Sequence, residues 1–209
     1  MTSRRAPWLL TVALAGLTVV LLAGTVVSAA WAWRASGVGP VVGPVVGGEG
    51  VAVRLPSGWV PLAADERVFY ADEQGDPVAE VDHAAVLDPG ACGGDPASHR
   101  GFVGLAPARG GPLDAVHRAA ERAWTAGLAA GAGQVEVVHR EVVGTARRTD
   151  LLVRVDEPDG CVPPLVRASL LTTREAAGPR TVVLVRDAGV PGAMSESEAD
   201  LVLEEVGGS

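Results

Sequence analysis

The sequence predicts an α+β protein that begins with a transmembrane helix and continues as an antiparallel β-sheet flanked by two helices. Three observations support this prediction. Residues 6–33 contain no charged side chain. Strand-like segments joined by short turns follow them, which favours antiparallel pairing. Two amphipathic segments, residues 112–131 and 195–206, supply apolar helix faces that can cover a sheet.

The first 33 residues predict a signal anchor. Residues 1–5 form a short cytoplasmic n-region that contains Arg4 and Arg5. About 20 apolar residues suffice to cross a bilayer, so residues 6–33 are long enough to form a transmembrane helix. The two arginines hold the N-terminus inside, which places the rest of the chain outside the cell membrane as a single-pass protein. Cleavage after Ala29, which would secrete the domain, is the alternative because small residues precede that position.

Residues 34–50 are predicted to be a tether. The unit Gly-Pro-Val-Val occurs twice in this segment, between further glycines. Glycine and proline at this density disfavour helix and strand. The folded extracytoplasmic domain is therefore expected to cover residues 51–209.

The first half of that domain is predicted to be mainly strand. Residues 51–60 alternate between apolar and polar side chains and break at Pro56-Ser57-Gly58, and residues 66–72 and 78–87 form two strands joined by a turn. Residues 88–111 are rich in glycine and proline, so we expect an irregular loop. Residues 112–131 form the first helix, which begins at a proline and ends at a glycine.

The second half contains four predicted strands and a closing helix. The strands cover residues 134–144, 149–157, 165–175 and 180–189. The last of them lacks alternation in Thr181–Val185, which indicates a central strand buried on both faces. The closing helix, residues 195–206, has Ser195 and Glu198 at the spacing of a capping box.

The charge distribution excludes a nucleic-acid role. The chain has a formal net charge of −8, every acidic residue follows residue 34, and no lysine occurs. An acidic domain repels the phosphate backbone of DNA and RNA.

Cys92 and Cys161 are predicted to form a disulfide, because two cysteines in an oxidising compartment are usually bonded. Two alternatives remain open at this point. Cys92, Asp95 and His99 could hold a metal, although structural zinc sites use four ligands. Cys92 could also act as a nucleophile with His99 as its base, which requires a lowered thiol pKa. We assign no catalytic, cofactor-binding or metal-binding residue.

Other conspicuous side chains are expected to be structural. Ser57 and Ser98 are predicted to be turn serines, and Trp59 and Trp124 core residues. His117 and Glu121 lie one helical turn apart, which favours a surface pair.

Several motifs together resemble a group of actinobacterial extracytoplasmic domains of unknown function. They are the opening "RLPSGWV", the cysteine loop, the alanine-rich helix, Cys161-Val-Pro-Pro and the closing "VVLVRDAGVPGAMSESEADLVLEEV". This group looks PsbP-like and is similar in layout to LpqN-type secreted domains, although this chain lacks a lipid-anchor cysteine. The resemblance covers residues 51–206 and implies a sheet between helices in the cell envelope.

The function expected from these features is that of a non-catalytic binding or accessory module of the cell envelope, and not of an enzyme. Its partners would be the membrane, through residues 6–33, and an envelope protein or small ligand, without a cofactor. Two alternatives remain: a structural or assembly subunit of a membrane complex, and an envelope enzyme with a site that the motifs do not reveal.

Overall fold

The computed structural model describes residues 43–48, 51–93, 95, 97–107 and 109–207. The predicted n-region (1–5), the predicted transmembrane helix (6–33) and the possible cleavage site after Ala29 lie outside the described residues. Within the described ranges, no helix is both long and apolar enough to cross a membrane.

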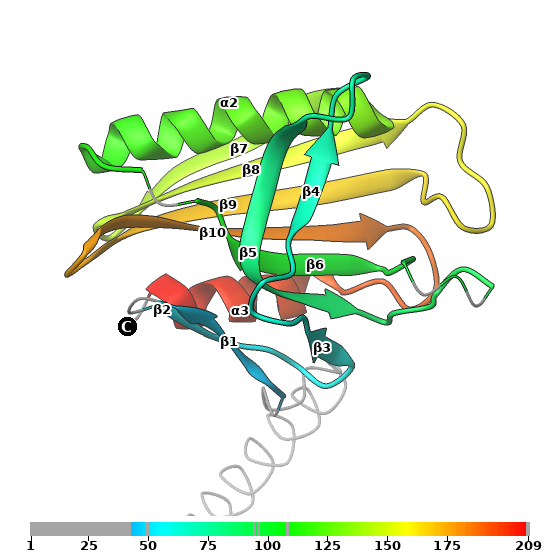
Figure 1. The fold of residues 1–209 in the computed structure, drawn as a ribbon, viewed down its shortest axis with the longest axis horizontal. Coiled ribbons are helices and arrows are strands. Elements are labelled where there is room, and N and C mark those ends of the chain that lie inside the picture. The colour runs from blue at the N-terminus through cyan, green and yellow to red at the C-terminus, as the bar shows by residue number, and fades with distance from the viewer. Residues whose placement is uncertain (1–42, 49–50, 94, 96, 108, 208–209) are drawn as a thin grey trace, which may run out of the picture. The chain divides into compact units, whose positions relative to one another are not determined.

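An eight-stranded antiparallel sheet forms the centre of the domain (Figure 1). Its order is β3-β5-β6-β10-β9-β8-β7, and β4 also pairs with β5. Its strands are β3 (Trp59–Pro61), β4 (Val68–Ala71), β5 (Pro77–Leu87), β6 (Gly101–Leu105), β7 (Gly133–Val143), β8 (Ala146–Val155), β9 (Leu165–Glu175) and β10 (Gly178–Ala188). From β7 to β10, each strand pairs antiparallel with the next one along the chain.

Different elements cover the two faces of this sheet. Helix α2 (Leu113–Ala132) lies along one face, and α3 (Glu196–Gly207) lies on the other (Figure 1). Beside α3, a two-stranded ribbon of β1 (Val45–Gly48) and β2 (Val51–Arg54) completes the second layer. The sheet therefore has a separate hydrophobic core on each side.

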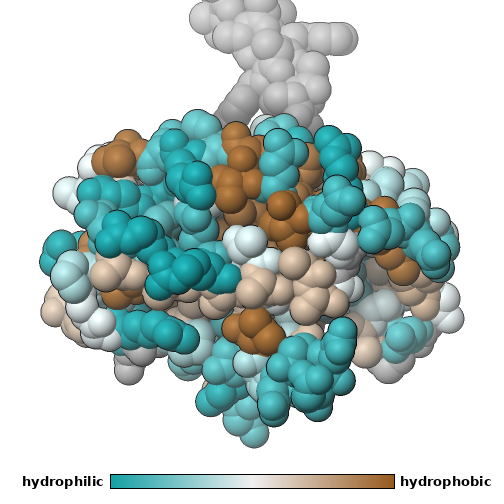
Figure 2. Space-filling model, turned by 90° about the horizontal axis from the view of Figure 1, so that it is seen from above, coloured by the Kyte–Doolittle hydropathy of each residue, from teal (hydrophilic) through white to brown (hydrophobic). Residues whose placement is uncertain are grey.

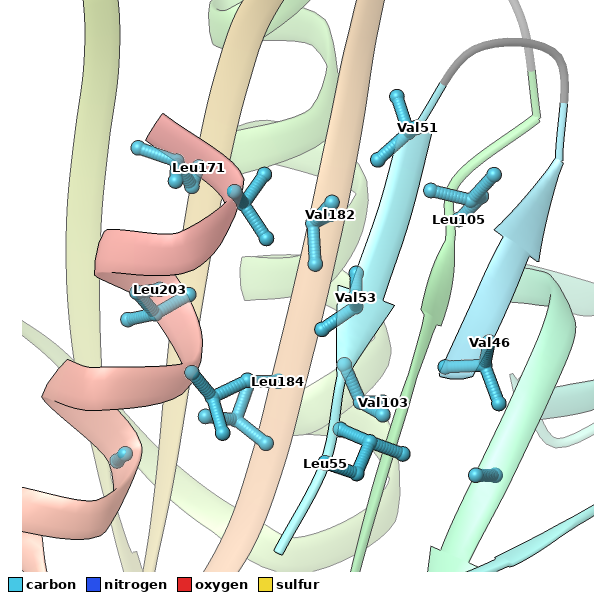
Figure 3. Close-up of a cluster of buried hydrophobic side chains, with 14 of the residues drawn as sticks. Val46, Val51, Val53, Leu55, Val103, Leu105, Leu171, Val182, Leu184 and Leu203 are labelled. Atoms are coloured by element: carbon cyan, nitrogen blue, oxygen red, sulfur yellow. The ribbon is translucent and has the colours of Figure 1, made fainter. Parts of the chain in front are cut away.

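The alternation of side chains along the strands builds these two cores. On the α3 side, Val182 and Leu184 of β10 pack with Leu203 of α3 and Val53 of β2 (Figure 3). Val183 and Val185 point the other way, into the core under α2. The prediction that Thr181–Val185 belongs to a central strand buried on both faces is confirmed, because β10 lies between β6 and β9.

Local signals at the helix ends also predicted the structure well. Helix α2 begins directly after Pro112. At the start of α3, the Ser195 N–H donates to Glu198 Oε2 at 2.9 Å and the Glu198 N–H donates to Ser195 Oγ at 3.2 Å. The predicted capping box is therefore confirmed.

The predicted α+β class is wrong. The described chain is mostly antiparallel β-sheet, and its two helices are a minor part of it. The PsbP-like sandwich of a sheet between two helices is replaced by a sheet that has a helix on one face and a helix with a β-ribbon on the other. The error arose because two strands lie in segments rich in glycine, for which local propensity predicts no regular structure.

The two missed strands are β1 and β6. Strand β1 lies within the predicted tether, residues 34–50, so that prediction is wrong at Val45–Gly48. Strand β6 lies within the predicted irregular loop, residues 88–111, and occupies a central position between β5 and β10. Glycine usually weakens a strand, but it is also used where another chain segment approaches closely.

Gly104 of β6 is such a position. A Cβ atom at Gly104 would lie 2.8 Å from Val81 Cβ and 2.9 Å from the Asp82 carbonyl oxygen. We expect Gly104→Ala to lower the free energy of unfolding by about 1–3 kcal/mol, because the extra methyl group overpacks the core. Gly160 is the matched control, because a Cβ atom there would have no neighbouring atom within 4 Å. Denaturant unfolding of both variants checks this, and equal stability of the two would contradict it.

Candidate functional site

A polar cleft opens on the α3 face of the sheet, where α3 leaves part of strands β7 to β10 uncovered. Its volume is about 390 Å³, which lies within the range of small-molecule sites. The residues that line it are Val138, His139, Glu141, Arg148, Asp150, Leu151, Arg167, Ala168, Ser169, Arg186, Glu196, Ala199 and Asp200. Four strands and one helix thus contribute to a single site.

A bulge in β7 turns two of these residues toward the cleft. Val137 pairs with Leu151 and His139 pairs with Asp150, so Val138 is an extra residue in β7. Before the bulge, Val135 and Val137 pack on the α2 side. The extra residue reverses the alternation, and His139 and Glu141 therefore line the cleft on the α3 side.

One end of the cleft is acidic. Three carboxylates surround the Arg148 guanidinium there: Asp150 at 3.0 Å, Asp200 at 2.9 Å and Glu141 at 3.8 Å. Burial alone would lower the pKa of Arg148, but the hydrogen bonds to Asp200 and Asp150 outweigh it and raise that pKa. With three carboxylates around one guanidinium, this end has an excess of negative charge.

The other end is basic. Arg186 of β10 and Arg167 of β9 are direct cross-strand partners. Arg167 donates to Glu196 Oε1 of α3 at 2.9 Å. Arg186 is 7% exposed and donates to the Met194 carbonyl at 3.0 Å, and among the described residues no carboxylate forms an ion pair with it. Burial, and then the charge of Arg167, lower the pKa of Arg186.

The two ends differ in how their charges are balanced. Like charges directly opposite each other on neighbouring strands destabilise a sheet. A buried arginine without a carboxylate partner has a further desolvation cost. The basic end therefore favours an anionic group from outside the chain, and the acidic end favours a cationic one.

The sequence did not predict this site because its residues are far apart in the chain. One local signal was present: Arg148 and Asp150 in β8, and Arg167 and Ser169 in β9, occupy alternate positions within strands. Such alternation indicates a polar face. It does not show that α3 leaves this part of the face open.

His117 and Glu121 are not the surface pair that the sequence predicted. His117 is 7% exposed. Its side chain points from α2 toward the sheet, where it lies between two threonines. Its Nε2 atom is 2.9 Å from Thr149 Oγ1, and its Nδ1 atom is 2.8 Å from Thr172 Oγ1. Glu121 accepts from Thr149 Oγ1 at 2.9 Å and pairs with Arg140 at 2.7 Å.

These bonds place a proton on Nε2, and burial, which lowers the pKa of His117, favours the neutral imidazole. The Glu121 carboxylate only accepts, so the Thr149 hydroxyl donates to it and must accept from His117 Nε2. Nδ1 then accepts from Thr172, whose own oxygen accepts from Thr181 at 2.8 Å. Each threonine hydroxyl in this hydrogen-bond network thereby has a partner. The network joins α2 to β8, β9 and β10 beneath it.

This network predicts a pH dependence of stability. Burial lowers the pKa of His117 below its usual value of 6.5. The unfolded chain therefore binds a proton more readily than the folded one, and stability falls as the pH drops from 6.5 through the folded-state pKa. We expect His117→Gln to reduce this slope by at most about 1.4 kcal/mol per pH unit. Urea unfolding at several pH values measures it, and equal slopes for both proteins would contradict the prediction.

The cysteine loop is organised by hydrogen bonds. The Cys92 N–H donates to Ser98 Oγ at 2.9 Å, and the Ser98 hydroxyl donates to the Asp95 carbonyl at 2.7 Å. Ser98 is thus a turn serine, as predicted. Cys92 and Cys161 lie 2.6 Å apart but remain free thiols. The structure brings the predicted partners together, and their disulfide stays a prediction.

The two alternatives for Cys92 find no support in this loop. In the part of the chain that the structure describes, no group of three His, Cys, Asp or Glu side chains is arranged to hold a metal. The contact with Cys161 raises the pKa of the Cys92 thiol, whereas a nucleophile requires a lowered one. The His99 ring packs edge-on against Phe102, with a centroid distance of 5.7 Å.

The α2 side offers a smaller groove. It has a volume of about 140 Å³ and lies between α2 and the start of β5, with alanines forming much of its wall. Figure 2 looks down on this side and shows apolar residues in separate groups between hydrophilic ones. The cleft beside α3 is therefore both the larger and the more highly charged of the two.

A family model described as a domain of unknown function (DUF8017) matches residues 36–206. The matched range includes every residue that lines the cleft. No curated protein matches the chain.

Proposed function

Because this chain belongs to DUF8017, a family of unknown function, its role must be argued from its own residues, and we propose that it is a non-catalytic ligand-binding module of the cell envelope. The observation that supports this proposal is the cleft of about 390 Å³ with the buried Arg186 in its wall. Its volume suits a small ligand, and its charges are only partly satisfied by the protein.

The construction of the cleft also suits binding. Its floor is built on three neighbouring strands, β8, β9 and β10, that pair over most of their length. A site on paired strands holds its side chains more rigidly than a site on loops. The guanidinium groups are therefore positioned before a ligand arrives, which lowers the entropic cost of binding.

Blocking the cleft tests the proposal. We expect a panel of amino acids, short peptides, phosphate esters and carboxylic acids to contain compounds that raise the Tm of the purified full chain. Ser169, 8% exposed in the cleft wall, would be replaced by tryptophan to fill the site. Val138→Trp, at the exposed bulge of β7, is a second blocking variant in case the first does not fold. Ala115→Trp, on the exposed side of α2, is the matched control.

The expected result is a shift in Tm for the wild type and Ala115→Trp and a loss of that shift in both blocked variants. A shift that survives blocking, or no shift with any compound, would overturn the binding proposal. Mass spectrometry of the recovered compounds tests the non-catalytic part, and a ligand that returns with an altered mass would refute it.

We further propose that residues 6–33 attach the protein to the cell membrane and that the domain faces outside. The apolar run and Arg4 and Arg5 support this placement. A C-terminal epitope tag should be accessible to antibody in intact cells and should sediment with membranes. A tag that is detected only after cell lysis would reverse the orientation, and a soluble protein would remove the attachment.

A further inference from the structure

The division of charge in the cleft indicates which class of ligand the proposed binding function serves. We infer that the cleft binds a short peptide of two or three residues with free termini, its carboxylate on Arg186 and Arg167 and its ammonium group at Glu141 and Asp150. This inference rests on the proposed function and deepens it.

The carboxylate position follows from the basic end. Arg186 and Arg167 are direct cross-strand partners, and Glu196, which pairs with Arg167, is the only carboxylate that forms an ion pair with either of them among the described residues. The Arg186 NH1 group donates to the Met194 carbonyl, which orients its guanidinium in the cleft wall. A ligand carboxylate between the two arginines would accept charge-assisted hydrogen bonds and relieve their repulsion.

The ammonium position follows from the acidic end. Glu141 forms the longest of the three contacts to Arg148, at 3.8 Å, and its side chain is 37% exposed. Asp150 is held by Arg148 at 3.0 Å, opposite His139 in the register. The other oxygen of Glu141 lies 3.5 Å from His139 Nε2. Both contacts of Glu141 are therefore long, and a ligand ammonium group can approach its carboxylate from the open side of the cleft.

The spacing of the strands sets the length of the ligand. The arginines are on β10 and β9, and the acids are on β8 and β7. Adjacent strands lie about 4.8 Å apart, and Asp150 pairs with Ser169, two residues from Arg167 in β9. One strand spacing and two residues of about 3.3 Å each therefore separate Asp150 from Arg167, or about 8 Å between their backbones. An extended chain spans about 3.3–3.6 Å per residue, so a peptide of two or three residues bridges this distance.

Matched peptides test the inference on the purified full chain by isothermal titration calorimetry. The probes are Ala-Ala-Ala, its N-acetyl derivative without the ammonium group, and its C-terminal amide without the carboxylate. We expect saturable binding of Ala-Ala-Ala and a loss of about tenfold or more in affinity for each blocked peptide, as for the removal of a charged hydrogen-bond partner.

Variants locate the two ends. Arg167→Gln is expected to weaken Ala-Ala-Ala binding about tenfold or more and to bring it to the level of the amide. Glu141→Gln should do the same for the ammonium end and bring the affinity to the level of the N-acetyl peptide. Arg174→Gln in β9 and Glu204→Gln in α3, both exposed and outside the cleft, are the matched controls and should bind as the wild type does.

The outcomes separate this inference from the proposed function. Equal binding of the amide or of the N-acetyl peptide would refute the corresponding end of the ligand, and no binding of Ala-Ala-Ala would refute the peptide altogether. If a phosphate ester or a simple carboxylic acid instead shifts the Tm in a way that Ser169→Trp abolishes, the binding function stands and the peptide assignment fails.

Discussion

Replacing Trp124 with alanine is expected to lower the free energy of unfolding by about 3–5 kcal/mol. Trp124 is 1% exposed and is among the largest fully buried side chains of the described chain. Its ring lies 5.8 Å from Phe102 and 6.0 Å from Tyr70, centroid to centroid, and meets Tyr70 edge-on. Its removal would leave a cavity where α2 meets the sheet, because the surrounding structure relaxes only partially around a deleted core side chain.

The single tyrosine of the chain provides a second measurement of the same change. Burial, and then the charge of Asp187, raise the pKa of Tyr70 to about 12. Loss of the Trp124 ring admits water to Tyr70, so its pKa should fall toward its ordinary value of 10.0. Denaturant unfolding measures the stability, and ultraviolet titration of the phenol measures the pKa.

Trp124→Phe is the conservative variant for this experiment. It retains an aromatic ring beside Tyr70, so the loss of stability should be smaller and the shift in the tyrosine pKa should be reduced. A Trp124→Ala protein with wild-type stability and an unchanged Tyr70 pKa would show that this aromatic cluster does not hold α2 to the sheet.

Oxidation of Cys92 and Cys161 to a disulfide is expected to raise the Tm by about 10 °C, an order-of-magnitude value for closing a loop of this length in a domain of this size. The bond would close about 70 residues and restrict the unfolded chain. Arg100 already joins the same regions, because its NH1 group donates to the Cys161 carbonyl at 3.3 Å and to Asp187 Oδ2 at 3.2 Å. The fold therefore holds both loops in place before the bond forms.

Thermal unfolding with and without reductant measures this effect, and peptide mapping under non-reducing conditions identifies the bond. The double variant Cys92→Ser and Cys161→Ser should unfold like the reduced protein and should not respond to reductant. If protein from the native membrane contains two free thiols, the predicted disulfide is wrong, and the extracytoplasmic placement loses one of its supports.

Much of the fold was predictable where the signal was local. Alternating side chains marked most of the strands, because a strand with one buried face must repeat every two residues. The spacing of Leu113, Val116, Trp124 and Leu128 marked α2, and these side chains are buried as an amphipathic helix requires. Ser195 and Glu198 marked the start of α3, because a capping box involves only neighbouring residues.

The candidate site was not predictable in the same way. Each of its charged residues is visible in the sequence. However, no local sequence pattern predicts that Arg186 will lie opposite Arg167 or that Asp150 will lie opposite His139. Strand register sets these neighbours, and one extra residue in β7 decides which face His139 and Glu141 occupy. A prediction based on unbroken alternation places them on the wrong side of the sheet.

The sequence by itself determined where most strands and helices form, that two separate segments cover the sheet as helices, and that the charge of the domain is negative. Only the tertiary structure decided that the glycine-rich segment around Gly104 is a central strand, that His117 is buried between two threonines, and that α3 leaves a charged cleft beside it. The physical reason is the range of the interactions: propensity, periodicity and capping act within a few residues, whereas close approach, register and burial depend on segments far apart in the chain.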